Sequence, residues 1–108
     1  MQSSVFDGNM DVLLIDVKLA CEIGLKEAIV LYEIAKLVKD SRIMHDNKRW
    51  VVITTEELQD RLPFLSLSTV GRLMNRLIDL ERLEVSDWGR KDAFDKRRWF
   101  TVRGVSRA

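Results

Sequence analysis

The chain has 108 residues, of which 46% are hydrophobic and 32% are charged. This size and composition are typical of one small globular domain, and they argue against a disordered segment or an enzyme that encloses several substrates. The formal net charge is only +1, so the chain is not a uniformly basic nucleic-acid binder. However, residues 86–108 hold seven basic and three acidic side chains. A polyanionic partner is therefore expected near the C-terminal end.

Several classes of function are unfavoured by what the sequence lacks. Cys21 is the single cysteine, so neither an intramolecular disulfide nor a Cys-rich zinc site can form. His45 is the single histidine, and no phosphate-loop, dinucleotide-binding or zinc-protease motif occurs. No apolar stretch approaches the roughly 18 residues of a membrane span, and the N-terminus does not resemble a signal peptide. We expect a cytoplasmic protein without enzymatic activity, cofactor, metal ion or membrane contact.

The first part of the chain predicts an arm followed by two helices. Residues 1–11 are mostly polar and aperiodic, which predicts a flexible N-terminal arm. Residues 12–15 form a short apolar run that could pair as a strand or cover the core. A short helix from Asp16 should end at Gly24, because glycine is favoured just past a helix C-terminus. A longer helix is predicted over Leu25–Lys39, where apolar residues recur at helical spacing.

A polar loop is expected over residues 40–48, followed by a buried strand over Arg49–Thr54. The next helix, roughly Thr55–Arg61, begins with the capping-box spacing of Thr54 and Glu57 and is stopped by Pro63. Ser66 then caps a longer helix that extends to about Leu83. Two helices joined by a short turn, the second with a polar face, are typical of a helix-turn-helix.

Two strands, over residues 83–88 and 99–102, are expected to flank a basic hairpin, which we define as residues 89–98. The order helix, strand, helix, helix, strand, hairpin, strand predicts an α+β, mainly α, winged helix-turn-helix. It would contain three or four helices, a small antiparallel sheet and a basic wing. Residues 12–103 would form this domain, and residues 104–108 a C-terminal tail.

Blocks spread over residues 12–103 carry a family resemblance: Leu13-Leu14-Ile15, Ile23-Gly24-Leu25, Arg49-Trp50-Val51, Ser66-Leu67-Ser68-Thr69-Val70 and Trp99-Phe100-Thr101-Val102. In order and spacing they resemble the winged-helix N-terminal domain of replication initiator proteins from phages and related mobile elements, which is related to the DnaD-type primosome proteins. The resemblance implies recognition of repeated duplex sites at a replication origin, often by a dimer.

Two sets of residues are candidates for contact with double-stranded DNA. On the predicted recognition helix they are Ser66, Ser68, Thr69, Arg72, Asn75 and Arg76, because Arg and Asn pair with guanine and adenine edges in the major groove. On the basic hairpin they are Arg90, Lys91, Lys96, Arg97 and Arg98, which could bind phosphate. Each set could instead be an ordinary solvated surface. The residues Trp50, Trp88 and Trp99 are expected to pack in the core or on the sheet.

A homodimer interface is the third candidate. The apolar residues Val12, Leu13, Leu14 and Ile15 could form it, although they could equally close the core of one domain. Two alternatives to origin recognition also stay open at this stage. The same fold serves small transcriptional regulators, and it serves replisome proteins that bind other proteins without binding DNA.

Overall fold

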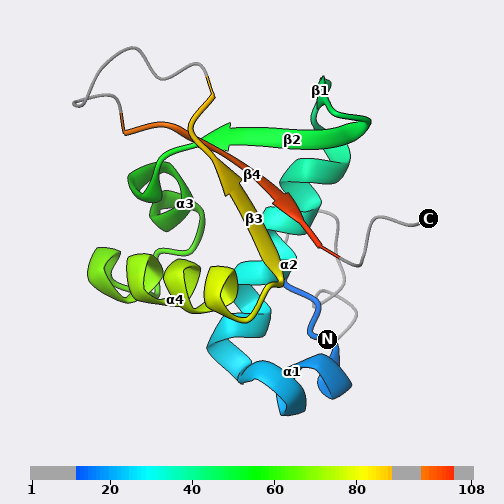
Figure 1. Cartoon of the computed structure of the whole chain (residues 1–108). Helices are drawn as coiled ribbons and strands as arrows, with labels where there is room; N and C mark the ends of the chain where they lie inside the picture. The colour runs from blue at the N-terminus through cyan, green and yellow to red at the C-terminus, as the bar shows by residue number, and fades with distance from the viewer. Residues whose placement is uncertain (1–11, 89–95, 104–108) are drawn as a thin grey trace, which may run out of the picture.

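Four helices and four strands form an α+β fold in the computed structural model, which describes residues 12–88 and 96–103. The helices are α1 (Val17–Ile23), α2 (Leu25–Asp40), α3 (Thr55–Arg61) and α4 (Leu67–Asp79). The strands are β1 (Ile43–His45), β2 (Lys48–Ile53), β3 (Leu83–Ser86) and β4 (Arg98–Val102). All pair antiparallel in one sheet of order β1-β2-β4-β3. In Figure 1, α2 passes behind the sheet and α4 continues through a short turn into β3.

Local signals in the sequence set the starts of three helices. The Asp16 carboxylate accepts a hydrogen bond from the amide of Leu19 at the start of α1. Thr54 and Glu57 form a complete capping box at the start of α3, and the Ser66 hydroxyl caps α4. These side chains satisfy amide groups that a helix start leaves without a backbone partner. The predicted starts are therefore confirmed.

Gly24 separates α1 from α2 and could not be another residue without strain. Its φ is +111°, and its amide donates to the carbonyl of Ala20. A Cβ at this position would lie 2.2 Å from Oε1 of Glu27, which packs over the glycine. The positive φ therefore favours glycine at the α1–α2 corner, and any side chain there would also have to displace the Glu27 carboxylate.

The main core lies between the helices and one face of the sheet. Apolar side chains of α2, α3 and α4 meet those of β2, β3 and β4; the largest fully buried ones in this cluster are Ile34, Leu58, Leu62, Leu73, Leu77 and Leu83. One charged residue, Glu33 of α2, is also buried, with 3% of its surface exposed. Its carboxylate lies 2.6 Å from Nε of Arg61 and 3.1 Å from Nζ of Lys36. The pair with Arg61 fastens the end of α3 to α2, so burial of this charge is compensated.

Three regions lie outside the described residues. They are the predicted N-terminal arm (1–11), the predicted C-terminal tail (104–108) and residues 89–95 of the basic hairpin. Among the residues that are described, every helix is too short or too polar to cross a bilayer.

The predicted polar loop over residues 40–48 was wrong in part, because it contains β1. Asp46 and Asn47 have φ values of 55° and 61° and connect β1 to β2 in a two-residue turn. Two positive φ values are the requirement of a type I′ hairpin, and Asp and Asn tolerate them. All three residues of β1 are exposed, so the strand shows no alternation of buried and exposed residues.

The predicted end of the long helix at Leu83 was also wrong. The helix ends at Asp79, and Leu83 is the first residue of β3. Glu81 adopts a left-handed φ of 59°, while its amide donates to Ile78 and that of Arg82 donates to Leu77. This pair of bonds is the Schellman motif, which closes a helix end. Glycine usually occupies this position, so the glutamate hid the helix end from the sequence pattern.

Residues 12–15 are not part of a strand. Leu13 packs against the core, whereas Val12, Leu14 and Ile15 are exposed, Leu14 to 65%. Of the two predicted arrangements, only the extended cover is consistent with this segment, and it is formed by Leu13 alone.

The left-handed backbone at Glu81 predicts that Glu81→Gly stabilises the domain. We expect the free energy of unfolding, measured by urea denaturation, to rise by about 0.5–1 kcal/mol, because glycine adopts this φ without steric cost. The control is Asp79→Gly at the last helical residue, which should lower stability by roughly 0.5–1 kcal/mol. A Glu81→Gly variant no more stable than the parent protein would contradict the strain assigned to Glu81.

Candidate functional site

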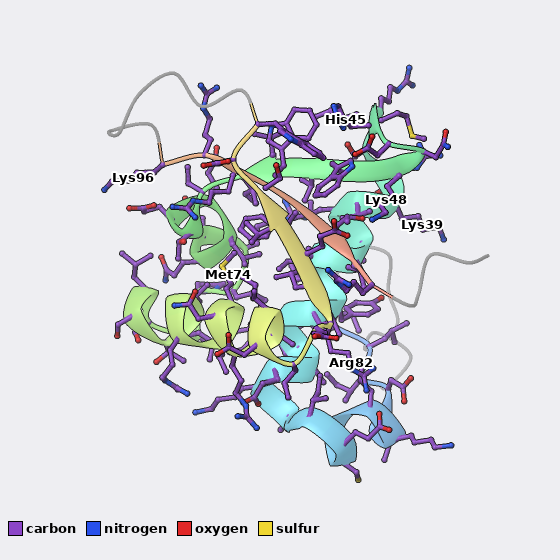
Figure 2. The ribbon with its side chains drawn as sticks, in the orientation of Figure 1. Lys39, His45, Lys48, Met74, Arg82 and Lys96 are labelled. Atoms are coloured by element: carbon purple, nitrogen blue, oxygen red, sulfur yellow. The ribbon has the colours of Figure 1, made fainter. Side chains whose placement is uncertain are left out.

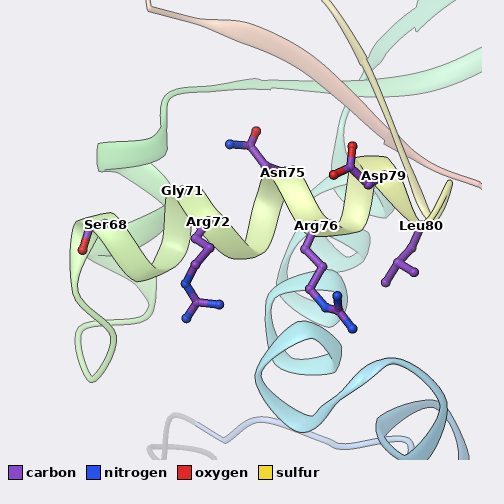
Figure 3. A pocket seen from close by; sticks show the side chains of 7 residues that line it. All are labelled: Ser68, Gly71, Arg72, Asn75, Arg76, Asp79 and Leu80. Atoms are coloured by element: carbon purple, nitrogen blue, oxygen red, sulfur yellow. The ribbon is translucent and has the colours of Figure 1, made fainter.

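Among the predicted contact residues, those on the exposed face of α4 form the clearest polar surface. The opposite face buries Val70, Leu73, Met74 and Leu77. The exposed face lines an open depression, and its residues are Ser68, Gly71, Arg72, Asn75, Arg76, Asp79 and Leu80. Figure 3 shows Asn75 and Asp79 directed to one side of the helix, and Arg72 and Arg76 to the other. All seven lining residues come from α4 or the residue after it, so this depression cannot enclose a small molecule.

Three predicted contact residues lie at the N-terminus of α4, and two of them are occupied by the helix cap. The Ser66 hydroxyl accepts from the Thr69 amide and lies 2.9 Å from the Thr69 hydroxyl. Ser68 is exposed, 3.4 Å from the Ser66 hydroxyl. Ser66 and Thr69 therefore have a structural role in starting α4, while Ser68 presents its hydroxyl to solvent.

The next three predicted residues differ in their freedom to bind a partner. Arg76 pairs with the partly buried carboxylate of Glu27 on α2, at 2.8 Å. Arg72 and Asn75 are exposed, and within residues 12–88 and 96–103 neither has a side-chain hydrogen bond or ion pair. Arg72 and Asn75 can therefore donate to a partner without first breaking an internal bond, whereas Arg76 would leave Glu27 unpaired.

A groove separates α4 from the sheet on the side of Asn75. Apolar side chains from both sides line it, Met74 and Ile78 of α4 and Val85 and Phe100 of the sheet. The polar residues that line it are Thr55, Glu56, Asn75, Lys96 and Arg98, and Gly71 lies among them. Lys96 Nζ is 3.7 Å from a Glu56 carboxylate oxygen. The groove thus brings the predicted recognition helix and the base of the basic hairpin together.

The basic hairpin is described only at its C-terminal end. Lys96, Arg97 and Arg98 are exposed there, and Arg98 begins β4 opposite Ile53 of β2. Arg90 and Lys91 lie outside the described residues.

For the predicted dimer interface, Val12, Leu14 and Ile15 are exposed beside exposed Val17 of α1. Their exposure leaves the predicted interface open without testing it.

An aromatic cluster covers the other face of the sheet, and sequence reasoning found only part of it. Trp50, Trp88 and Trp99 pack edge to face, with ring centroids 4.9 and 5.4 Å apart. His45, labelled in Figure 2, packs against Trp88 with ring centroids 3.9 Å apart, and its carbonyl accepts from the Trp50 indole. The packing expected for the tryptophans is confirmed. The place of His45 was missed because it depends on β1 pairing with the edge of β2.

Other residues of the site were missed for similar reasons. Glu27 and Glu56 are distant in sequence from Arg76 and Lys96, and no local pattern predicts these ion pairs. Gly71 could have been noticed, because a glycine inside a helical pattern weakens the helix. Within the described part of the chain, no group of three or more His, Cys, Asp or Glu side chains could hold a metal ion.

Comparison with known proteins gives the site no external support. No protein-family model, no curated protein and no solved structure matches this chain.

Proposed function

We propose that residues 12–103 form a winged-helix domain that binds double-stranded DNA in a sequence-specific manner, with α4 in the major groove. The observation that carries the proposal is the exposed pair Arg72 and Asn75, without partners among the described residues, beside the base of a basic hairpin. Their guanidinium and amide groups are suited to bidentate hydrogen bonds with guanine and adenine.

The arrangement of the elements supports this proposal. The order α2, β2, α3, α4, β3 and β4 is that of a winged helix, and α3 and α4 are joined by a short turn that includes Pro63. Gln59 of α3 donates to the carbonyl of Leu65 at 3.0 Å, and both Leu62 and Leu65 are buried. The turn is therefore held from both sides, which fixes the direction in which α4 leaves it.

Charge supports a limited role for general attraction to DNA. On α4, Arg76 is compensated by Glu27, and Asp79 adds a negative charge near the C-terminal end. Lys96, Arg97 and Arg98 lie at the C-terminal end of the basic hairpin. In this proposal the first half of α4 reads bases, while the hairpin binds phosphates.

We propose further that the biological role is origin recognition for a phage or mobile element, since the sequence blocks resemble such initiators. A homodimer through residues 12–15 would then read repeated or palindromic sites. A transcriptional regulator would use the same surface. The two roles differ in the position of the sites: repeated sites at an origin support initiation, and a single operator over a promoter supports regulation.

Replacing the two base-reading candidates should abolish discrimination between DNA sequences. A duplex would first be enriched from a random library on the wild-type protein. For Arg72→Ala/Asn75→Ala, we expect the ratio of affinities for the enriched and random duplexes to fall by about tenfold or more, because each bidentate contact contributes roughly 1–3 kcal/mol. Fluorescence anisotropy would measure both affinities.

The control is Lys39→Ala on α2, which Figure 2 places on the opposite side of the molecule from Lys96. It should leave the ratio unchanged. An unchanged ratio for the double variant would overturn the assignment of α4 as the reading helix. Failure of the wild type to bind any duplex at about 50 mM salt would overturn DNA binding itself and favour a protein partner.

The hairpin is expected to act on every duplex alike. Lys96→Gln/Arg98→Gln should weaken binding to enriched and random duplexes by the same factor. It should also reduce the slope of log K against log salt by about 0.9 for each phosphate that the variant no longer neutralises. The control, Arg103→Gln, removes one positive charge just past the other end of β4 and should leave the slope unaltered. Weaker binding to the enriched duplex alone would contradict a phosphate-binding role.

A further inference from the structure

Gly71 is a glycine that the fold itself does not require. It lies within α4, away from both helix ends, and it has no positive φ. A Cβ built on it would meet a single atom, Cγ2 of Thr55, at 3.9 Å, which is an ordinary van der Waals contact. Gly24, by contrast, has both a positive φ and a clash at 2.2 Å. Neither conformation nor packing within the described structure therefore explains glycine at position 71.

A glycine inside a helix is also unfavourable, because it loses more backbone entropy on folding than alanine. A glycine at a position where alanine would fit therefore calls for another cause. Close approach of a partner to the backbone is such a cause, since glycine alone leaves the helix surface without a Cβ.

The position of Gly71 indicates where such a partner would lie. Gly71 and Asn75 line both the exposed depression of α4 and the groove between α4 and the sheet. The opposite wall of that groove carries the cations Lys96 and Arg98, and Arg98 has no side-chain partner among the described residues. Gly71 thus borders both the polar face of α4 and the groove that Lys96 and Arg98 also line.

We propose that one sugar–phosphate strand of the duplex lies in this groove and passes directly over Gly71, with its phosphates facing Lys96 and Arg98. This inference rests on the proposed function and adds the site and the ligand group. With α4 in the major groove, Lys96 and Arg98 would lie on the other side of the strand that borders this groove. The strand passes closest to the protein where the helix is thinnest, and that point is Gly71.

Glu56 is the one carboxylate among the described residues that line the groove, and it bears on the proposal. Its oxygen lies 3.7 Å from Lys96, where a phosphate would compete with it for the same cation. Glu56 is not part of the capping box, which uses Glu57. Glu56→Gln should therefore leave α3 folded and strengthen binding to all duplexes, because it removes a repulsive charge and releases Lys96.

The test is to add back the missing side chain. Gly71→Ala should raise Tm by roughly 2–8 °C, because alanine favours the helix. It should nevertheless weaken binding to a random-sequence duplex and to the enriched duplex by the same factor, about five- to hundredfold. Gly71→Leu should weaken both further. The control Cys21→Ala, at an exposed site on α1, should leave DNA affinity unchanged.

The outcomes separate this inference from the function beneath it. A more stable Gly71→Ala variant that binds both duplexes as tightly as the wild type would overturn the strand position and leave DNA binding intact. Weaker binding to the enriched duplex alone would also overturn it, since Gly71 would then face base edges. If the wild-type protein binds neither duplex, the proposed function fails and this inference fails with it.

Discussion

Burial of one narrow apolar stripe on α4 determines how the rest of the molecule is arranged. Val70, Leu73, Met74 and Leu77 recur at the spacing of one helix face, and each is at most 4% exposed. Burying side chains of this size contributes roughly 1.5–3 kcal/mol each, so a rotation of α4 about its axis would be strongly opposed. The direction of Arg72 and Asn75 is therefore a consequence of the core. Burial of the apolar stripe thus holds the opposite, polar face of α4 toward solvent.

The two ends of α4 place the sheet beside that face. Ser66 starts the helix directly after the turn from α3, and the left-handed Glu81 closes its end shortly before β3 begins at Leu83. The connection to β3 is so short that the strand must leave close to the helix. The amide of Arg103 donates to the carbonyl of Arg82 and closes the end of the β3–β4 pair that lies next to α4. The groove beside Gly71 follows from this tight connection.

Local chemistry explains which elements could be predicted from the sequence. Caps at Asp16, Thr54 and Ser66 act within three residues, so the helix starts were predictable. The strand β1 was missed because its side chains are all exposed and its existence depends on pairing with β2. For the candidate site, periodicity predicted which α4 residues face outward. It could not predict that Glu27 would form an ion pair with Arg76, because that pair forms only when α2 and α4 pack together.

The distribution of ion pairs bears on how a DNA partner would be held under the proposed function. Arg76 and Lys96 each lie near a carboxylate, while Arg72 and Arg98 have no such neighbour among the described residues. Two of these four cations are thus already partly neutralised, and salt screens the long-range attraction of phosphate further. Affinity would then depend on short-range fit between α4, the groove and the duplex. Such dependence on fit explains why a single methyl group at Gly71 should affect binding more than its small volume suggests.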